Sequence, residues 1–168
     1  MGFNGLNRMK DTTKIVRLIC TVTVCLLIGF LGSSATTDSV TTWYVGLSRP
    51  SFTPPDWTFG VVWPILYVMM GISAFLIWNK GLDKREVKVA LSIFGLQLIL
   101  NGLWTPIFFG LHLIGLALIE ILMMWAAILL TIIYFWKVSK LAALLLLPYI
   151  LWVSFAVILN ASLFLLNR

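Results

Sequence analysis

The chain has 168 residues, of which 61% are apolar and only 11% are charged, and its mean hydropathy is +1.03. Because soluble domains carry roughly 25% charged residues, this composition excludes a soluble globular domain and indicates an integral membrane protein of one domain. The net charge of +6 does not indicate a nucleic-acid partner, because Lys and Arg form short clusters beside apolar runs, where they act as topology signals.

Five apolar runs are long enough to form membrane-crossing helices, each of which needs about 20 residues. The runs are continuous rather than alternating, which excludes a transmembrane β-barrel. We therefore predict an all-α membrane protein, a bundle of five transmembrane helices at residues 15–34, 58–79, 87–110, 113–136 and 141–166. Residues 1–14 form an N-terminal segment, and residues 15–167 form the transmembrane domain.

The first run also resembles a signal peptide, because basic residues precede it and small residues at 33–35 resemble a cleavage site. Its apolar part is longer than the roughly 7–15 residues of such a segment. We expect it to be retained as a span, with cleavage as the alternative.

Positive charge alternates from one end of the predicted bundle to the other. Lys and Arg are frequent before the first run and in the second and fourth connections, whereas the first connection holds only Arg49 and the third holds neither. The positive-inside rule places the N-terminus in the cytoplasm and the first loop and the C-terminus on the outer side.

The first connection, residues 35–57, is long, aromatic and stiffened by proline. Most connections in compact domains are only about 4–6 residues long. A long, stiff, aromatic loop between two spans is expected of a segment that covers a site. We predict a lid there, carried by Trp43, Arg49, Pro54, Pro55 and Trp57.

The third run carries two amides and two aromatic residues, Gln97, Asn101, Trp104 and Phe108, at helical spacing. Polar side chains within a span face the protein interior or a cavity. One interpretation is hydrogen bonding between helices, worth about 0.6–2 kcal/mol per contact. The other is the wall of a ligand site with amide donors.

Two further runs carry aromatic stripes at the same spacing. They comprise Phe59, Trp63, Tyr67 and Met70 in the second run, and Tyr149, Trp152, Ala156, Leu159 and Leu163 in the fifth, with Asn160 at the edge. One stripe alone is usually packing, but three together favour a pocket for a flat apolar ligand. Trp and Tyr supply stacking faces and one hydrogen-bonding atom each.

Glu120 is the one ionisable residue placed well inside a predicted span. An intramembrane carboxyl is a functional group by default, but pairing with an amide at a helix contact is the alternative. His112, the only histidine, occupies the tight third connection, where solvation is more common than haem ligation. The sequence has no metal-ligand cluster, so no metal site is expected.

Three motifs in this order resemble those of the TspO/MBR family, the tryptophan-rich sensory proteins and translocator proteins. They are WYVGLSRPSFTPPDWTFGVVWPILYVMMG, LNGLWTPIFFG and LLLLPYILWVSFAVILNASLFLLN, which together extend over residues 43–167. The resemblance implies a five-helix bundle, often a homodimer, with a ligand pocket closed by the first loop. It also implies porphyrin or haem as a ligand, with no obligatory cofactor.

The family's pocket positions match Tyr44, Trp63, Asn101, Trp104, Trp152 and Ala156. The stripes add Tyr67 and Phe108 to this predicted ligand site. Some family members bind sterols, but Ala161 and Ser162 stand where the cholesterol motif of animal members needs a tyrosine.

We therefore expect a membrane tetrapyrrole-binding protein that acts as a sensor, carrier or regulator. Its expected partners are the tetrapyrrole, membrane lipid and a second copy of the chain, without nucleic acid. One alternative is a light-dependent porphyrin-degrading enzyme, because Trp63 and Trp152 match the tryptophans implicated in such activity, which makes them candidate catalytic residues. The other is a lipid- or sterol-binding transport protein. The sequence leaves the physiological ligand and the question of catalysis open.

Overall fold

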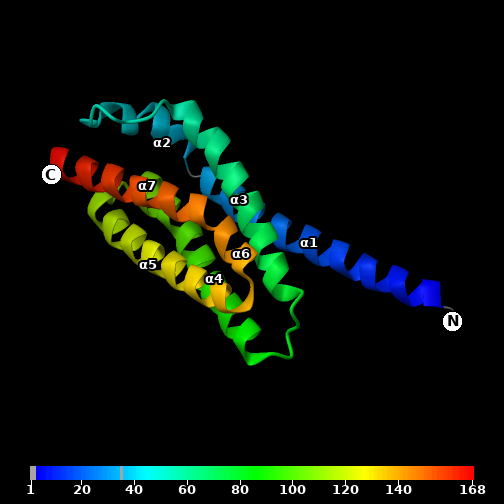
Figure 1. Ribbon diagram of the computed structural model, residues 1–168. Helices are drawn as coiled ribbons and strands as arrows, with labels where there is room; N and C mark the ends of the chain where they lie inside the picture. Colours follow the sequence, from blue (N-terminus) through cyan, green and yellow to red (C-terminus); the bar gives the residue numbers. More distant parts are fainter. Residues whose placement is uncertain (1–2, 35) are drawn as a thin grey trace.

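The computed structural model describes residues 3–34 and 36–168, which are folded into helices joined by short connections (Figure 1). In chain order the elements are α1 (Phe3–Ser34), α2 (Thr37–Thr41), the 3₁₀ turn η1 (Tyr44–Gly46), α3 (Asp56–Trp78), α4 (Arg85–Thr105), the π-helical segment η2 (Pro106–Gly110), α5 (Ile114–Val138), α6 (Lys140–Leu145) and α7 (Leu147–Leu166).

Among the described residues, five helical segments are long and apolar enough to cross a membrane. They are Asp11–Ser33, Asp56–Trp78, Arg85–Gly110, Ile114–Val138 and Lys140–Leu166. This confirms the predicted all-α class with five helices able to span a membrane. The protein is therefore an integral, multi-pass membrane protein.

The helices are placed by local sequence signals at their ends. Asp56 and Glu86 stand in the first turns of α3 and α4, where a negative charge complements the helix dipole. After α3 ends, Gly81 adopts φ +105°, a conformation that L side chains rarely adopt, and so allows the tight return to α4.

Some helices pack against their neighbours in the chain, and others pack against helices further along it. α4 lies along α5, α1 lies along α3, and α5 lies against both α6 and α7. Gly71 permits the close approach of α1 and α3, because a Cβ atom there would lie 2.5 Å from Cα of Val22. The N-terminal part of α1 extends beyond the other helices (Figure 1).

The fifth crossing is broken, whereas the sequence predicted one continuous span at residues 141–166. α6 ends at Leu145, and α7 begins at Leu147 with Pro148 in its first turn. Proline has no N–H to donate to an earlier carbonyl, and a helix start tolerates that loss. The two helices together form one crossing, and α6 stays against α3 while α7 lies along α5.

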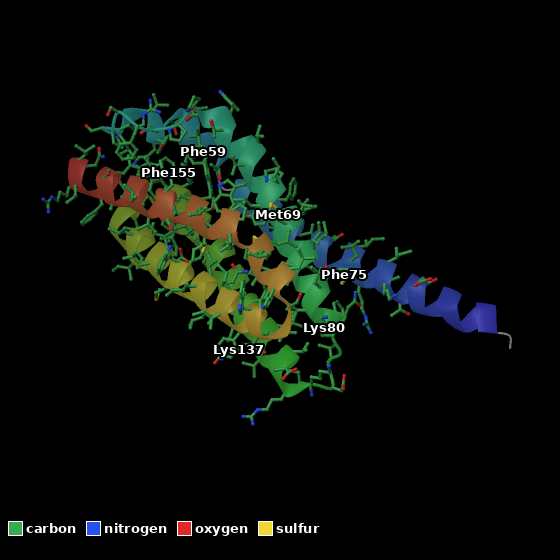
Figure 2. The ribbon with its side chains drawn as sticks, in the orientation of Figure 1. Phe59, Met69, Phe75, Lys80, Lys137 and Phe155 are labelled. Atoms are coloured by element: carbon green, nitrogen blue, oxygen red, sulfur yellow. The ribbon has the colours of Figure 1, made fainter. Side chains whose placement is uncertain are left out.

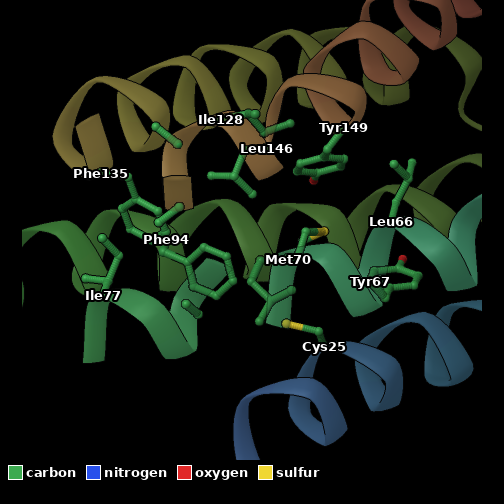
Figure 3. Close-up of a cluster of buried hydrophobic side chains, with 14 of the residues drawn as sticks. Cys25, Leu66, Tyr67, Met70, Ile77, Phe94, Ile128, Phe135, Leu146 and Tyr149 are labelled. Atoms are coloured by element: carbon green, nitrogen blue, oxygen red, sulfur yellow. The ribbon is translucent and has the colours of Figure 1, made fainter. Parts of the chain in front are cut away.

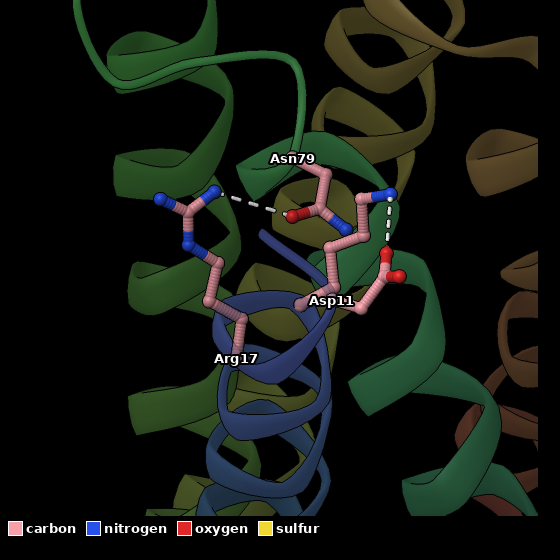
Figure 4. Close-up of polar contacts among 4 residues, drawn as sticks. Asp11, Arg17 and Asn79 are labelled. Atoms are coloured by element: carbon pink, nitrogen blue, oxygen red, sulfur yellow. Dashed lines mark hydrogen bonds and ion pairs between the residues drawn. The ribbon is translucent and has the colours of Figure 1, made fainter. Parts of the chain in front are cut away.

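One end of the bundle carries the basic residues of the connections. Figure 2 shows Lys80 and Lys137 at this end, after α3 and in the last turn of α5. Arg17 of α1 donates a hydrogen bond of 3.2 Å to Oδ1 of Asn79 (Figure 4). Its guanidinium also lies 5.6 Å above the Trp78 ring. These contacts tie α1 to the end of α3.

Candidate ligand-binding site

A chain of hydrogen bonds crosses the interior between α3, α4 and α7. The Tyr67 hydroxyl donates to Oδ1 of Asn101 at 2.7 Å. Nδ2 of Asn101 donates to the Tyr149 hydroxyl at 3.0 Å, and that hydroxyl donates to Oε1 of Gln97 at 2.9 Å. Figure 3 shows Tyr67 on α3 and Tyr149 on α7, both among the buried side chains of the interior. Three helices are therefore joined by one buried polar chain.

The spacing of Gln97 and Asn101 explains why α4 supplies two links of this chain. Four residues apart on one helix, both amides face inward, and they are 1% and 5% exposed. Gly29 of α1 leaves room for the Tyr67 ring, since a Cβ atom there would overlap it. The predicted amide stripe thus forms hydrogen bonds between helices, as its first interpretation required.

Aromatic rings lie directly beside this polar chain. The Trp63 ring stacks on Tyr67 with centroids 5.5 Å apart, and it meets the edge of Tyr149 at 6.4 Å. The Trp152 ring contacts Phe59 at 5.7 Å, edge to face. Together with the half-buried Ala156, these residues bring the aromatic stripes of the second and fifth runs into one interior.

A second aromatic group lies nearer the lid. The Trp104 ring stacks on Phe108 at 4.9 Å, and its indole nitrogen donates to Oδ1 of Asn160 at 3.2 Å. Nδ2 of Asn160 donates in turn to the carbonyl of Ile114 at 3.1 Å. The π-helical segment η2, which begins at Pro106, aims Phe108 into this group.

The predicted lid covers the second aromatic group. Tyr44 is 6% exposed, and its ring lies 6.3 Å from Phe108 and 5.6 Å from Phe109. The Arg49 guanidinium sits 5.5 Å above the Tyr44 ring. Burial raises the pKa of the Tyr44 hydroxyl, the Arg49 charge opposes that rise, and the Asp56 charge adds to it.

Three hydrogen bonds and one ring stack hold the lid down. The Ser48 N–H donates to Oδ1 of Asn167 at 2.9 Å, and Nδ2 of Asn167 donates back to the Ser48 carbonyl at 2.9 Å. The Ser39 hydroxyl donates to the Phe109 carbonyl at 2.6 Å. The Trp43 ring stacks on His112 with centroids 4.2 Å apart. No local pattern in the sequence indicated these partners, which lie far apart along the chain.

The remaining predicted lid residues lie at its edge. Trp57 stands in the first turn of α3 and is 70% exposed, so its ring is not brought to the aromatic interior. Pro55 caps that helix, and Pro54 precedes it, half-buried. These prolines set the entry of the chain into α3.

Glu120 of α5 is the notable polar group that sequence reasoning left outside the predicted site. It is 3% exposed, and in the described part of the chain neither carboxyl oxygen has a hydrogen-bond partner. Nε2 of Gln97 likewise has no partner among the described residues. The interior therefore retains free donor and acceptor capacity beside the polar chain.

A five-helix membrane bundle with stacked tryptophans, a buried amide–tyrosine chain and an aromatic lid defines a tryptophan-rich multi-pass membrane protein. The TspO/MBR family model matches residues 21–166. The chain belongs to this family, as the resemblance of its motifs predicted.

Three relatives illustrate the extent of the similarity. The chain is 42% identical over 154 residues to the tryptophan-rich protein TspO of Chlorobaculum tepidum, covering 92% of this chain and 98% of that protein. It is 44% identical over 155 residues to the same-named protein of Archaeoglobus fulgidus, covering 92% and 99%. Against the translocator protein of Homo sapiens, identity is 41% over 133 residues, with 78% of each chain covered.

Proposed function

We propose that this protein binds a tetrapyrrole, a porphyrin or haem, in the aromatic interior beneath the lid, and that it acts as a sensor, carrier or regulator. The observation that carries this proposal is the convergence of Trp63, Trp104 and Trp152 on one interior that also holds hydrogen-bonding groups. A porphyrin offers the matching chemistry, a wide apolar plane with a few polar atoms.

The indole rings would supply stacking faces for the plane of the ligand. Gln97 would offer its amide Nε2, which has no hydrogen-bond partner among the described residues, to a polar atom of the ligand. Asn101 would do the same by giving up a bond to Tyr67 or Tyr149. Ligand entry requires the rings to move apart, since Trp63 now lies on Tyr67 and Trp104 lies on Phe108.

Arg49 gives the lid a role in recognition as well as closure. Its guanidinium lies over Tyr44, on the side of the site where the lid meets the outer ends of the helices. Arginine pairs with carboxylates through two parallel hydrogen bonds. We assign Arg49 to a propionate group at the edge of a bound porphyrin.

The test compares two tryptophans in a dark titration with protoporphyrin. Trp152→Ala removes an interior stacking face and should weaken affinity at least roughly tenfold, or about 1.4 kcal/mol. The matched control is Trp136→Ala, because Trp136 is 48% exposed near the end of α5, beside Lys140. Equal affinities in the two variants would exclude the interior as the binding site.

Light-dependent porphyrin breakdown is the second candidate function. It is favoured by the contact between Trp63 and Tyr67, two oxidisable side chains stacked at 5.5 Å. Under illumination the Trp63→Phe protein should still bind porphyrin, but the bound pigment should be degraded more slowly than in the unmodified protein. The same rate of pigment loss in both proteins would remove this candidate and leave binding alone.

A further inference from the structure

A groove opens on the lipid-facing surface between α3 and α7. Val62, Ile65, Leu66 and Met69 line it from α3, at the spacing of one helix face. A matching stripe from Pro148 to Phe155 lines it from α7. Its volume is about 470 Å³, within the roughly 300–1,000 Å³ range of small-molecule sites. Figure 2 shows Phe155 near the lid end and Met69 further along α3.

The break in the fifth crossing explains why this groove exists. α6 packs against α3, but after Leu146 the chain turns and α7 packs mainly against α5. Because α1 packs against another side of α3, α3 does not follow α7, and the two helices diverge after Leu146. Ile65 and Leu151 are 55% and 70% exposed, which leaves the groove open to the hydrocarbon of the membrane.

Trp152 belongs both to the groove and to the interior. Its ring lines the groove, yet its indole nitrogen is buried and has no partner among the described residues. Two other interior indoles are anchored by hydrogen bonds, since Trp104 donates to Asn160 and Trp125 donates to Ser154 at 2.8 Å. An unpaired N–H in a membrane interior is costly. The Trp152 ring is therefore held by packing against Phe59 and Phe155.

We propose that the planar ligand reaches the interior sideways from the membrane, through this groove, with Trp152 as the movable gate. This inference rests on the proposed function and adds the route and the class of ligand, a flat molecule dissolved in the lipid phase. The groove is apolar, opens to lipid and ends at a ring that already belongs to the candidate site. The outer route is closed by the lid contacts of Ser39, Trp43 and Ser48.

The test fills the groove without touching the interior. Ile65→Trp adds bulk in the groove, and Val68→Trp, on the same helix but outside the groove lining, is the matched control. Both proteins are reconstituted in phosphatidylcholine vesicles, and protoporphyrin already dissolved in protein-free vesicles is mixed in. Pigment absorbance, which added tryptophan does not obscure, reports the association and dissociation rates. Leu151→Trp fills the groove from α7 as a second variant.

A blocked entrance slows entry and exit by the same factor. It raises the barrier between the free and the bound ligand without changing the free energy of either state. We expect Ile65→Trp and Leu151→Trp to lower both rates at least roughly fivefold at unchanged affinity, with Val68→Trp unaffected. Unchanged rates, or a loss of affinity from faster release alone, would overturn the lateral route and leave the proposed function standing. No saturable binding by the unmodified protein would instead overturn the proposed function, and this inference with it.

Discussion

At the scale of single residues, Tyr149 has a central place in the bundle. Its hydroxyl accepts a hydrogen bond from Asn101 and donates one to Gln97. A tyrosine hydroxyl both donates and accepts, so it can join the amide nitrogen of one side chain to the amide oxygen of another. One side chain thereby fixes the orientation of two others and the relative position of α4 and α7.

We predict that Tyr149→Phe leaves Nδ2 of Asn101 and Oε1 of Gln97 without partners. A buried polar group without a partner costs about 1–3 kcal/mol, so thermal stability in detergent should fall. Tyr134→Phe is the control, because that ring is half-buried beneath Lys137 at the far end of α5. Equal melting temperatures for the two variants would show that the polar chain does not stabilise the bundle.

At the scale of elements, the lid and α7 are joined by the pair of hydrogen bonds between Ser48 and Asn167. We predict that Asn167→Ala removes both bonds, at a cost of about 1–3 kcal/mol. Backbone amides of residues 43–49 should then exchange with deuterium faster. Ser162→Ala is the control, because that hydroxyl bonds only within α7, to Ile158. Unaltered exchange in Asn167→Ala would mean that the lid is held without the Ser48–Asn167 pair.

The contact of α1 with α3 gives a second prediction at this scale. Gly71→Val would force Cβ into the backbone of Val22, and overpacking of this kind costs about 1–3 kcal/mol. Gly60→Ala in the same helix meets nothing within 4 Å and should be neutral or slightly stabilising. Thermal denaturation of both variants in detergent measures the difference. A Gly71→Val protein as stable as the Gly60→Ala protein would refute this close approach.

The elements also show what the sequence can and cannot predict. The spans and the inward face of α4 follow from hydropathy and from the spacing of Gln97 and Asn101, which are local properties. The break at Leu146 and the π-helical segment at Pro106 depend on how proline is accommodated by neighbouring helices. The pairing of Ser48 with Asn167 joins residues 119 positions apart, so no local pattern reveals it.

At the scale of the whole molecule, the alternation of basic residues predicts the orientation in the membrane. The connection between α3 and α4 should be cytoplasmic, and the lid should lie outside. We predict that Ser51→Cys reacts with a membrane-impermeant maleimide on intact cells, whereas Leu82→Cys reacts only after lysis. Cys20 and Cys25 are replaced by serine in both proteins. The reverse labelling pattern would invert the topology.

The arrangement of the helices also bears on the proposed binding of a ligand. The lid closes one end, the basic residues occupy the other, and the groove between α3 and α7 opens to lipid. The aromatic interior between them combines stacking faces with polar atoms of Glu120 and Gln97 that have no hydrogen-bond partner in the described part of the chain. This arrangement suits a wide planar molecule better than an ion, which would require charged or oxygen-rich coordination.

The most direct test of tetrapyrrole binding is titration of the purified, detergent-solubilised protein with protoporphyrin in the dark, followed by tryptophan fluorescence. Binding in the aromatic interior predicts quenching that saturates, because the indoles of Trp63, Trp104 and Trp152 would contact the pigment directly. Quenching that rises in proportion to added pigment without saturation, and equally in Trp152→Ala, would contradict the account.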